Sequence, residues 1–348
     1  MDPRHAPFPA GRMRRLRTRG AIRDLVRECR LDPDDLIQPL FVKDDDGPDE
    51  PIASMPGQSR VSLKSLQGIA RRADDLGVRA IALFPKVADS LKSEEAREAW
   101  NPNGLVPAAI AAIKEVAPDL AVITDIALDP YSSLGQDGIV VDGRIDNEAT
   151  IEALIRQSLC HARAGADIVA PSDMMDGRIG EIRKALDTVG YTDTLILSYA
   201  AKYASAFYGP FRDALDSAPR GGGDKKTYQM DPGNGAEALV EAARDLDEGA
   251  DLLMVKPGMP YLDILYRVKQ EFGRPTFAYQ VSGEYAMFKA AGANGWIDER
   301  KTVLEALLGF KRAGADAILT YYAIEVAGWL RADRLAAKRV APAGPSSV

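Results

Sequence analysis

The sequence is short of histidine and cysteine, and this shortage excludes much of the chemistry that enzymes use. Among 348 residues there are only two histidines, His5 and His161, and two cysteines, Cys29 and Cys160. A Ser-His-Asp triad, a histidine-rich zinc site and a histidine general base are therefore poorly supported. We expect His161, inside a predicted helix, to be packed or at the surface. Acid–base and nucleophilic chemistry must then come from lysine, aspartate, tyrosine or serine.

Long apolar runs and an export signal are also missing. No stretch approaches the roughly 18 to 20 uninterrupted apolar residues that a membrane span needs. The first residues lack the apolar core of a signal peptide, and two cysteines give no disulfide framework. We therefore expect a cytoplasmic protein with no membrane contact. The composition, 46% apolar and 27% charged, is typical of a globular chain with a full core.

The net charge of −7 argues against general nucleic-acid binding. One basic run, Arg12 to Arg19, is the local exception and could mimic a phosphate-binding arm. It has no interleaved aromatic residues of the kind that bind nucleic acid. We interpret the run as an arm that packs on the acidic surface of a neighbouring subunit, and we expect no nucleic-acid partner.

Short apolar, β-branched runs alternate along the chain with longer segments of helical period. The apolar runs show little alternation, as expected for parallel strands buried on both faces. Eight of them are predicted as strands: Leu36–Val42, Ala80–Lys86, Ala121–Ala127, Ala166–Ser172, Leu195–Ala200, Asp251–Pro257, Thr276–Ser282 and Ala317–Tyr322. The predicted helices between them include Ser62–Leu76, Asn147–Ala164, Gly180–Val189, Ala236–Glu248, Tyr261–Glu271 and Thr302–Ala313.

Eight βα units in roughly 250 to 300 residues predict an α/β protein of the TIM (β/α)8 barrel type. A doubly wound sheet is the alternative, but no G-x-G-x-x-G follows the first predicted strand. Gly-Ala-Asp precedes three strands, at Gly165, Gly249 and Gly314, and is predicted to end a helix there. The barrel is expected over residues 34–340, with an extension at 1–33 and a loose tail at 341–348.

Two lysines follow apolar strands, where an ammonium costs several kcal/mol to desolvate. Lys202 stands in S-Y-A-A-K-Y and Lys256 in L-L-M-V-K-P, both with aromatic residues nearby. Burial and a second cation lower the pKa of a lysine, so that its neutral amine can form a Schiff base with a carbonyl. In the structural alternatives, Lys256 extends along the rim to water and Lys202 is an ordinary helix-start lysine.

Further polar side chains follow the predicted strands, where a barrel carries its active site. As structural alternatives, the aspartates could cap backbone amides and the tyrosine could belong to the core. These residues are Asp125, Asp129, Ser172, Asp173, Ser282, Glu284 and Tyr321.

Two long connections, Tyr203–Gln229 and Pro130–Asp146, are predicted to be either lids or ordinary surface loops. On the first, Arg212, Lys225 and Lys226 could be a solvated cluster or could bind a substrate carboxylate.

Several long strings resemble those of the porphobilinogen synthase (5-aminolevulinate dehydratase) family. They are D-I-A-L-D-P-Y-S-S-L-G-Q-D-G, A-P-S-D-M-M-D-G-R, S-Y-A-A-K-Y-A-S-A-F-Y-G-P-F-R-D-A, T-Y-Q-M-D-P, L-M-V-K-P-G-M-P-Y-L-D and Y-Q-V-S-G-E-Y. The resemblance extends from Arg12 to Ala327 and implies a TIM barrel with an N-terminal arm. It also implies condensation of two 5-aminolevulinate molecules to porphobilinogen, with loss of two waters, in tetrapyrrole biosynthesis. Assembly through the arm at residues 1–33 into a homo-octamer or a homo-hexamer is implied as well.

The resemblance also implies a role for each matching site residue. Lys202 and Lys256 match the two Schiff-base lysines, with Lys256 in the propionate-side half-site. Ser282 and Tyr321 match residues that hold one substrate carboxylate. The other carboxylate is held by residues that match Arg212, Lys225 and Gln229, with lysine at 225 where some members have arginine. Residues beside the substrate amino group match Asp125 and Ser172.

The metal site of the zinc-dependent members is where this sequence departs from the family. Their Cys-x-Cys-x7-Cys motif is replaced by Ala127, Asp129 and Asp137, and Leu134 replaces a histidine. Without thiolates, zinc is not expected. Two carboxylates could hold Mg²⁺ or K⁺, although we expect no catalytic metal. Glu241 matches a glutamate that holds an activating Mg²⁺ in some relatives, but a helix-surface glutamate is usually only solvated.

Two other functions stay open from the residues alone. A Schiff-base aldolase can use the same barrel but normally needs one lysine. A non-enzymatic, binding or chaperone-like oligomer would be expected to lose a lysine or a carboxylate-binding group, and all of them are present.

Overall fold

Eight parallel strands close into a barrel in the computed structural model, which describes residues 7–45, 47–215 and 224–340. Each strand pairs with its neighbour in chain order, and β1 pairs with both β4 and β12, so the sheet closes. The predicted TIM barrel is confirmed. The strands are β1 Leu36–Lys43, β4 Ala80–Lys86, β5 Ala121–Ile126, β8 Ile168–Pro171, β9 Leu195–Lys202, β10 Leu252–Lys256, β11 Thr276–Gln280 and β12 Ala317–Thr320.

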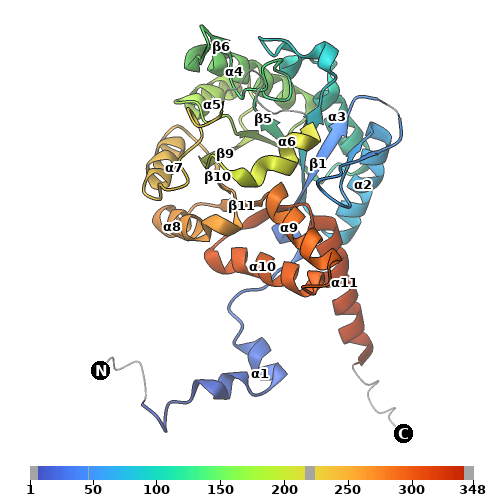
Figure 1. Cartoon of the computed structure of the whole chain (residues 1–348), viewed down its shortest axis with the longest axis vertical. Coiled ribbons are helices and arrows are strands. Elements are labelled where there is room, and N and C mark those ends of the chain that lie inside the picture. The colour runs from blue at the N-terminus through green and yellow to red at the C-terminus, as the bar shows by residue number, and fades with distance from the viewer. Residues whose placement is uncertain (1–6, 46, 216–223, 341–348) are drawn as a thin grey trace.

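Helices surround the barrel and cover the outer faces of its strands (Figure 1). Their ends carry the expected signals: the side chains of Ser62, Asp146 and Asp298 accept hydrogen bonds from backbone N–H groups of the first turn. These helices are α2 Leu63–Leu76, α3 Leu105–Val116, α4 Asn147–Ala164, α5 Arg178–Thr188, α7 Glu237–Asp247, α8 Leu262–Phe272, α9 Ser282–Ala293, α10 Glu299–Ala313 and α11 Ala323–Val340.

The Gly-Ala-Asp turns end helices as predicted. Gly165, Gly249 and Gly314 have φ values of 102°, 105° and 108°, a region in which only glycine is relaxed. They follow α4, α7 and α10, and each turn leads directly into the next strand.

Short elements complete the loops. Of these, α6 packs against α9 and the end of β4 and lies over the barrel strands in Figure 1. The others include a two-stranded sheet inside the predicted Pro130–Asp146 connection. They are β2 Glu50–Pro51, β3 Ser59–Val61, β6 Val140–Val141, β7 Arg144–Ile145, α6 Gly209–Leu215, and the 3-10 turns η2 Pro33–Asp35, η3 Asp89–Leu91, η4 Arg97–Trp100, η5 Ala206–Tyr208 and η6 Met259–Tyr261.

Three strand ends differ from the sequence prediction by two residues, and most of the others differ by one. β12 ends at Thr320 rather than at Tyr322; the other two are the ends of β9 and β11. β9 runs to Lys202 rather than ending at Ala200, so this lysine belongs to the strand and not to a following helix. β11 ends at Gln280, and Ser282 is the first residue of α9. The apolar run continues past the last strand residue of β11, so hydrophobicity alone does not mark the end.

The N-terminal segment stands apart from the barrel (Figure 1). Its 3-10 turn η1, Met13–Arg17, and its helix α1, Gly20–Leu25, contain no buried residue. The predicted tail, residues 341–348, lies outside the described residues, as do residues 1–6. In the described part of the chain, no helix combines the length and apolar character that a membrane crossing requires.

Candidate active site

Lys202 and Lys256 end neighbouring strands and lie directly opposite each other in the register of β9 and β10. A register irregularity makes this possible. Three steps on β9, from Ser198 to Ala201, oppose two steps on β10. Residues three apart on a regular strand point to opposite faces, but this extra residue lets Tyr199 and Lys202 both face Lys256. Such bulges commonly redirect side chains beside active sites.

The ammonium of Lys256 lies among aromatic rings and not beside a carboxylate. The side chain is only 6% exposed, and its Nζ makes no hydrogen bond or ion pair within the described residues. Burial, and secondly the charge of Lys202, lowers the pKa of Lys256 to about 7. A large share of its amine is therefore neutral near neutral pH. The rings around Nζ belong to Tyr199, Tyr208, Phe211 and Tyr279, with centroids at 5.2, 5.2, 5.0 and 4.8 Å.

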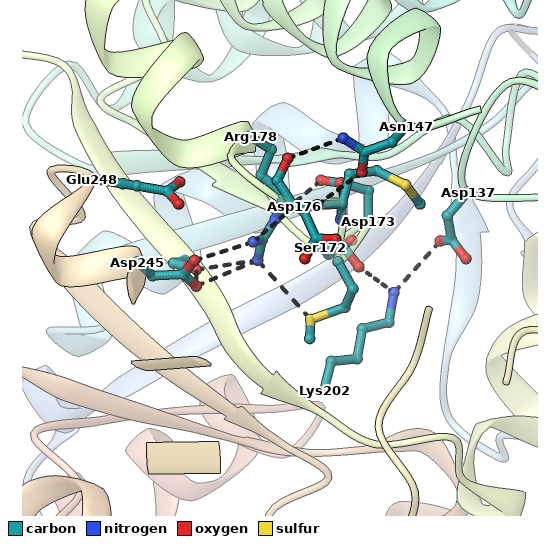
Figure 2. Close-up of polar contacts among 12 residues, drawn as sticks. Asp137, Asn147, Ser172, Asp173, Asp176, Arg178, Lys202, Asp245 and Glu248 are labelled. Carbon is teal, nitrogen blue, oxygen red and sulfur yellow. Dashed lines mark hydrogen bonds and ion pairs between the residues drawn. The ribbon is translucent and has the colours of Figure 1, made fainter. Parts of the chain in front are cut away.

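Lys202, in contrast, has oxygen atoms as partners of its amine. Its Nζ donates to the backbone carbonyl of Ser172 and lies 3.4 Å from Asp137 Oδ1. Figure 2 shows the lysine pointing between these two groups. The two register partners thus differ in surroundings: one is enclosed by rings, the other is held by oxygen atoms.

Lys225 joins the two loops beside Lys202. Its Nζ lies 3.2 Å from Asp129 and 3.0 Å from Asp137 Oδ2, and all three side chains are buried. Burial would raise the pKa of Asp137, but Lys202 and Lys225 lower it well below its usual range. Burial would lower the pKa of Lys225, but the charges of Asp129 and Asp137 outweigh burial and raise it. Asp137 is therefore ionised, and both carboxylates are already paired with lysines.

Asp125 lies near the end of β5. Among the carboxyl groups of the cavity, its pKa is the one that suits proton transfer. Burial raises the pKa of Asp125 to about 6, opposed mainly by the charge of Lys256. A carboxyl group with this pKa can both accept and release a proton near neutral pH. Ser172 follows β8, the strand that pairs with β5. The hydrogen bond of its side chain to Asp125 also opposes the rise in the pKa of Asp125.

A small cavity brings most of the predicted site residues together. Ser282 and Tyr321 do not line it. Ser282 Oγ accepts from Phe211 N at 2.9 Å and donates to Phe207 O at 3.3 Å, and Tyr321 OH bonds Tyr279 OH at 2.9 Å. The cavity is lined by Asp125, Asp129, Asp137, Ser172, Lys202, Tyr208, Phe211, Arg212, Lys225, Gln229 and Lys256.

Arg212 and Gln229 contribute uncommitted polar groups to this cavity. Arg212 makes no hydrogen bond or ion pair with any other described residue, and Gln229 Oε1 is buried without a hydrogen-bond partner there. Both belong to the predicted Tyr203–Gln229 connection, of which residues 216–223 lie outside the described residues. The remaining parts of this connection supply one face of the site.

Sequence reasoning assigned no role to several residues that shape the site. The ring cage of Lys256 was signalled only by the aromatic residues around Lys202. Glu284, noted as a strand-end residue, accepts from the backbone N–H groups of Met259, at 2.5 Å, and of Val281. It therefore joins the loop after Lys256 to the start of α9. A buried ion-pair network around Arg178 had no sequence signal that we used.

Two other predicted residues lie elsewhere. His161 is fully buried on α4, and burial lowers its pKa to about 3, so it is a packed, neutral histidine. This is the first of the two alternatives expected for it, packed or at the surface. Glu241 is half-buried on α7 and lines a separate cavity of about 930 Å³ that includes Asp176 and Asn147. Burial, and then Asp245, raises the pKa of Glu241.

The residues after β5 that stand where zinc-dependent members carry cysteines do not fit a zinc ion. Ala127 has no donor atom, and Asp129 and Asp137 are already paired with lysines. Among the residues that the structure describes, no group of three or more His, Cys, Asp or Glu side chains could hold a metal. Carboxylates that are neutralised by ammonium groups are poor ligands for a further cation.

Comparison with known proteins agrees with the fold and identifies the family. Residues 10–329 match the family Delta-aminolevulinic acid dehydratase. The chain is 53% identical over 317 residues to that enzyme from Rhodobacter capsulatus, covering 91% of this chain and 96% of the relative. It is 55% identical over 320 residues to that of Bradyrhizobium diazoefficiens, covering 92% and 91%.

A solved structure is equally similar. It is the delta-aminolevulinic acid dehydratase (porphobilinogen synthase) of Toxoplasma gondii in complex with the reaction product porphobilinogen. The TM-score is 0.93 at 54% identity, covering 97% of this chain and 96% of that one. The predicted family and enzyme class are confirmed: this chain belongs to the delta-aminolevulinic acid dehydratase family.

Proposed function

We propose that this dehydratase makes porphobilinogen from two 5-aminolevulinate molecules that are held as Schiff bases on Lys256 and Lys202. The observation that carries the proposal is the pair itself: two buried lysines opposite each other on adjacent strands, in one cavity. A single imine-forming lysine would serve an aldolase, whereas two amines side by side suit the joining of two ketones.

The first imine forms on Lys256 in this proposal. Because its pKa is about 7, its neutral amine can add to the ketone of one substrate. Loss of water then gives the imine. The second ketone reacts in the same way with Lys202, and a second water leaves. New C–C and C–N bonds between the two substrates release both lysines, so two waters are lost overall.

Proton transfer is assigned to Asp125, with Ser172 beside it. The support is the pKa of Asp125, about 6, and its electrostatic coupling to both lysines. It can take a proton from a substrate ammonium or carbon and return it in a later step. An imine withdraws electrons from its neighbouring carbon, so this base need not be strong.

The substrate carboxylates need cations and donors at two places. Arg212, Lys225 and Gln229 serve one substrate. The support is the guanidinium of Arg212 in the cavity wall, which has no ion-pair partner in the described part of the chain. Ser282 and Tyr321 serve the other. Ser282 Oγ now bonds to the backbone of Phe207 and Phe211, so a carboxylate would have to replace those bonds.

No catalytic metal is needed in this proposal, because lysines already neutralise the aspartates that stand at the zinc positions. A Mg²⁺ at Glu241 is a separate proposal, supported by the cavity in which this half-buried glutamate lies. Magnesium ions usually keep several waters and few carboxylate ligands, which one glutamate in a roomy, polar cavity permits.

Self-association and location complete the proposal. A homo-octamer or homo-hexamer through residues 1–33 is supported by the absence of any buried residue in η1 and α1. Such an exposed segment gains stability by packing on another subunit. A reducing cytoplasm suits the two free cysteines.

The test is borohydride trapping with 5-aminolevulinate in chelator-treated buffer, followed by peptide mass mapping. An adduct on Lys256, alone or with Lys202, is the expected result. The absence of an adduct, with none after Mg²⁺ is restored, would refute the Schiff-base mechanism. Turnover by Lys256→Met at the normal rate would refute it as well.

A further inference from the structure

A buried arginine lies behind Lys202, outside the cavity that holds the substrate. Arg178 is the first residue of α5 and is 2% exposed. Its guanidinium lies between Asp173, which follows β8, and Asp245 on α7, both of which are also buried. Figure 2 shows Arg178 pointing at Asp245 on one side, with Ser172 and Lys202 on the other.

The guanidinium contacts three separate elements. Nη1 lies 3.2 Å and Nη2 3.5 Å from the two carboxylate oxygens of Asp245, and Nε lies 3.5 Å from Asp173 Oδ2. Nη2 also donates to Ser198 Oγ on β9 at 3.3 Å, and that hydroxyl donates to Asp245. One side chain thus joins α7, the β8–α5 turn and the strand that carries Lys202.

The turn that it holds is strained. Met174 has φ 69°, a left-handed conformation that costs about 1 kcal/mol or more for a residue other than glycine. Asp173 Oδ1 accepts from Met175 N at 2.8 Å, and Arg178 Nη1 donates to Met175 O at 3.3 Å. The network therefore binds both the backbone N–H and the backbone C=O of Met175, the residue after Met174.

The same turn presents the carbonyl that binds Lys202. Ser172 O accepts from Lys202 Nζ, and Ser172 N donates to Ile126 O at 3.0 Å. Ser198, the β9 contact of Arg178, precedes the bulge that brings Lys202 to the interior. The network therefore acts on Lys202 from two directions, through its hydrogen-bond acceptor and through its strand.

Stability alone does not explain this arrangement. Two carboxylates and one guanidinium leave a net negative charge in the interior, and burial raises the pKa of Asp173 to about 6. Apolar residues of similar volume are often at least as stabilising as a buried ion pair. What such a network provides is a defined position for the groups that it contacts.

We propose that Arg178 is a positioning residue for Lys202, acting through Asp173 and the Ser172 carbonyl and through Ser198 on β9. The role rests on the proposed function of Lys202 as the second Schiff-base lysine. Lys256 lies on β10, which the guanidinium does not contact. Loss of Arg178 should therefore impair the second half-site and spare the first.

The experiment compares Arg178→Met, Arg178→Lys and Ser198→Ala with the wild-type protein. For each we would measure kcat, KM and the rate of borohydride-trapped adduct formation on Lys256. We expect kcat to fall by roughly 10- to 100-fold in Arg178→Met, since a displacement of about 1 Å can cost that much. The adduct rate on Lys256 should fall much less than kcat, because a Lys202 displaced by about 1 Å keeps its charge beside Lys256. Arg178→Lys should recover only part of kcat, because one ammonium cannot contact three elements.

Arg183→Met is the matched control. Arg183 lies on the same helix and also binds an aspartate, Asp187, at 2.7 Å and two backbone carbonyls, but it contacts no residue of the site. We expect some loss of thermal stability, smaller than for the buried Arg178, with normal kcat.

Three outcomes would overturn the proposal. Loss of kcat and of the Lys256 adduct in equal measure would indicate general loosening of the barrel. Unchanged kcat in Arg178→Met would show that Lys202 needs no such support. If Arg178→Met does not fold, normal kcat in both Ser198→Ala and Arg178→Lys would decide against it. A wild-type protein that forms no Lys256 adduct would instead refute the proposed function.

Discussion

Lys202 lowers the pKa of Lys256, its register partner on the neighbouring strand, and only burial has a larger effect on that pKa. In the proposed mechanism, one lysine therefore prepares the other for reaction. The arrangement requires that the two lysines have different surroundings. The oxygen partners of Lys202 and the ring cage of Lys256 provide that difference.

The first prediction concerns the pH at which Lys256 becomes reactive. In the wild-type protein, adduct formation on Lys256 should rise with pH and have its midpoint near the pKa of about 7. Lys202→Met removes the neighbouring charge, so the pKa of Lys256 should rise and the midpoint should move to higher pH. The midpoint is measured by borohydride trapping with 5-aminolevulinate at pH values from 5 to 10. Lys226→Met, at an exposed lysine, is the control, and an unmoved midpoint in Lys202→Met would contradict the coupling.

Lys256 should also make the folded protein less stable than it could be. Its pKa is about 7 in the folded protein, against 10.5 for a free lysine side chain, so the unfolded chain binds more protons between these pH values. Stability attributable to this group therefore rises with pH over that window, and the penalty is fully present below pH 7. Lys256→Met should be inactive yet more stable by roughly a few kcal/mol at pH 6. Urea unfolding at pH 6 and pH 9 would show a smaller advantage at pH 9.

A chelator should leave turnover unchanged, because Asp129 and Asp137 already form ion pairs with lysines. The expected result is normal activity in excess chelator and no zinc by metal analysis. Complete loss that only Mg²⁺ restores would contradict this. Partial stimulation by Mg²⁺ that disappears in Glu241→Gln, with basal activity kept, would instead support the proposed Mg²⁺ site at Glu241.

Arg212 should contribute to substrate binding more than to chemistry. Arg212→Met removes from the cavity wall a cation that has no ion-pair partner among the described residues, so KM should rise by about tenfold or more while kcat changes less. Initial rates over a range of 5-aminolevulinate concentrations measure both. Lys226→Met, an exposed cation on the same connection, should leave KM unchanged, and equal effects of the two variants would indicate only a general electrostatic contribution.

Glu284 should matter for Lys256 although it lies outside the cavity. Burial raises the pKa of Glu284 to about 8, opposed by the backbone N–H groups that it accepts from. In Glu284→Gln the amide NH₂ would face one of these N–H donors, and the loop after Lys256 would lose a bond. We expect at least a tenfold fall in the rate of the Lys256 adduct. Glu325→Gln, on a surface helix, is the control, and a normal adduct rate in Glu284→Gln would contradict the role.

Much of the fold was predictable because each βα unit carries local signals. Non-alternating apolar runs indicate strands buried on both faces, and a glycine in left-handed conformation ends a helix at Gly165, Gly249 and Gly314. The order of these signals implies the barrel, and the barrel implies that strand ends share one rim. For this reason Lys202, Lys256 and Asp125 could be assigned to one site from the sequence.

Side-chain surroundings were not predictable in this way. The bulge on β9, the Glu284 contacts and the Arg178 network depend on residues far apart in the chain, such as Asp173 and Asp245. No local pattern encodes which of them meet. Ser282 and Tyr321 show the same limit: they follow their strands as expected but do not line the cavity. Ser282 bonds the backbone of Phe211, and Tyr321 bonds Tyr279.

The sequence by itself determined the barrel, the family and the two lysines, because periodicity, turn glycines and long motif strings are local properties of the chain. Only the tertiary structure decided which of the two lysines has its pKa lowered towards neutral pH. Burial and electrostatic coupling depend on distances between β9, β10 and the loops above them, and those distances exist only after the barrel has closed.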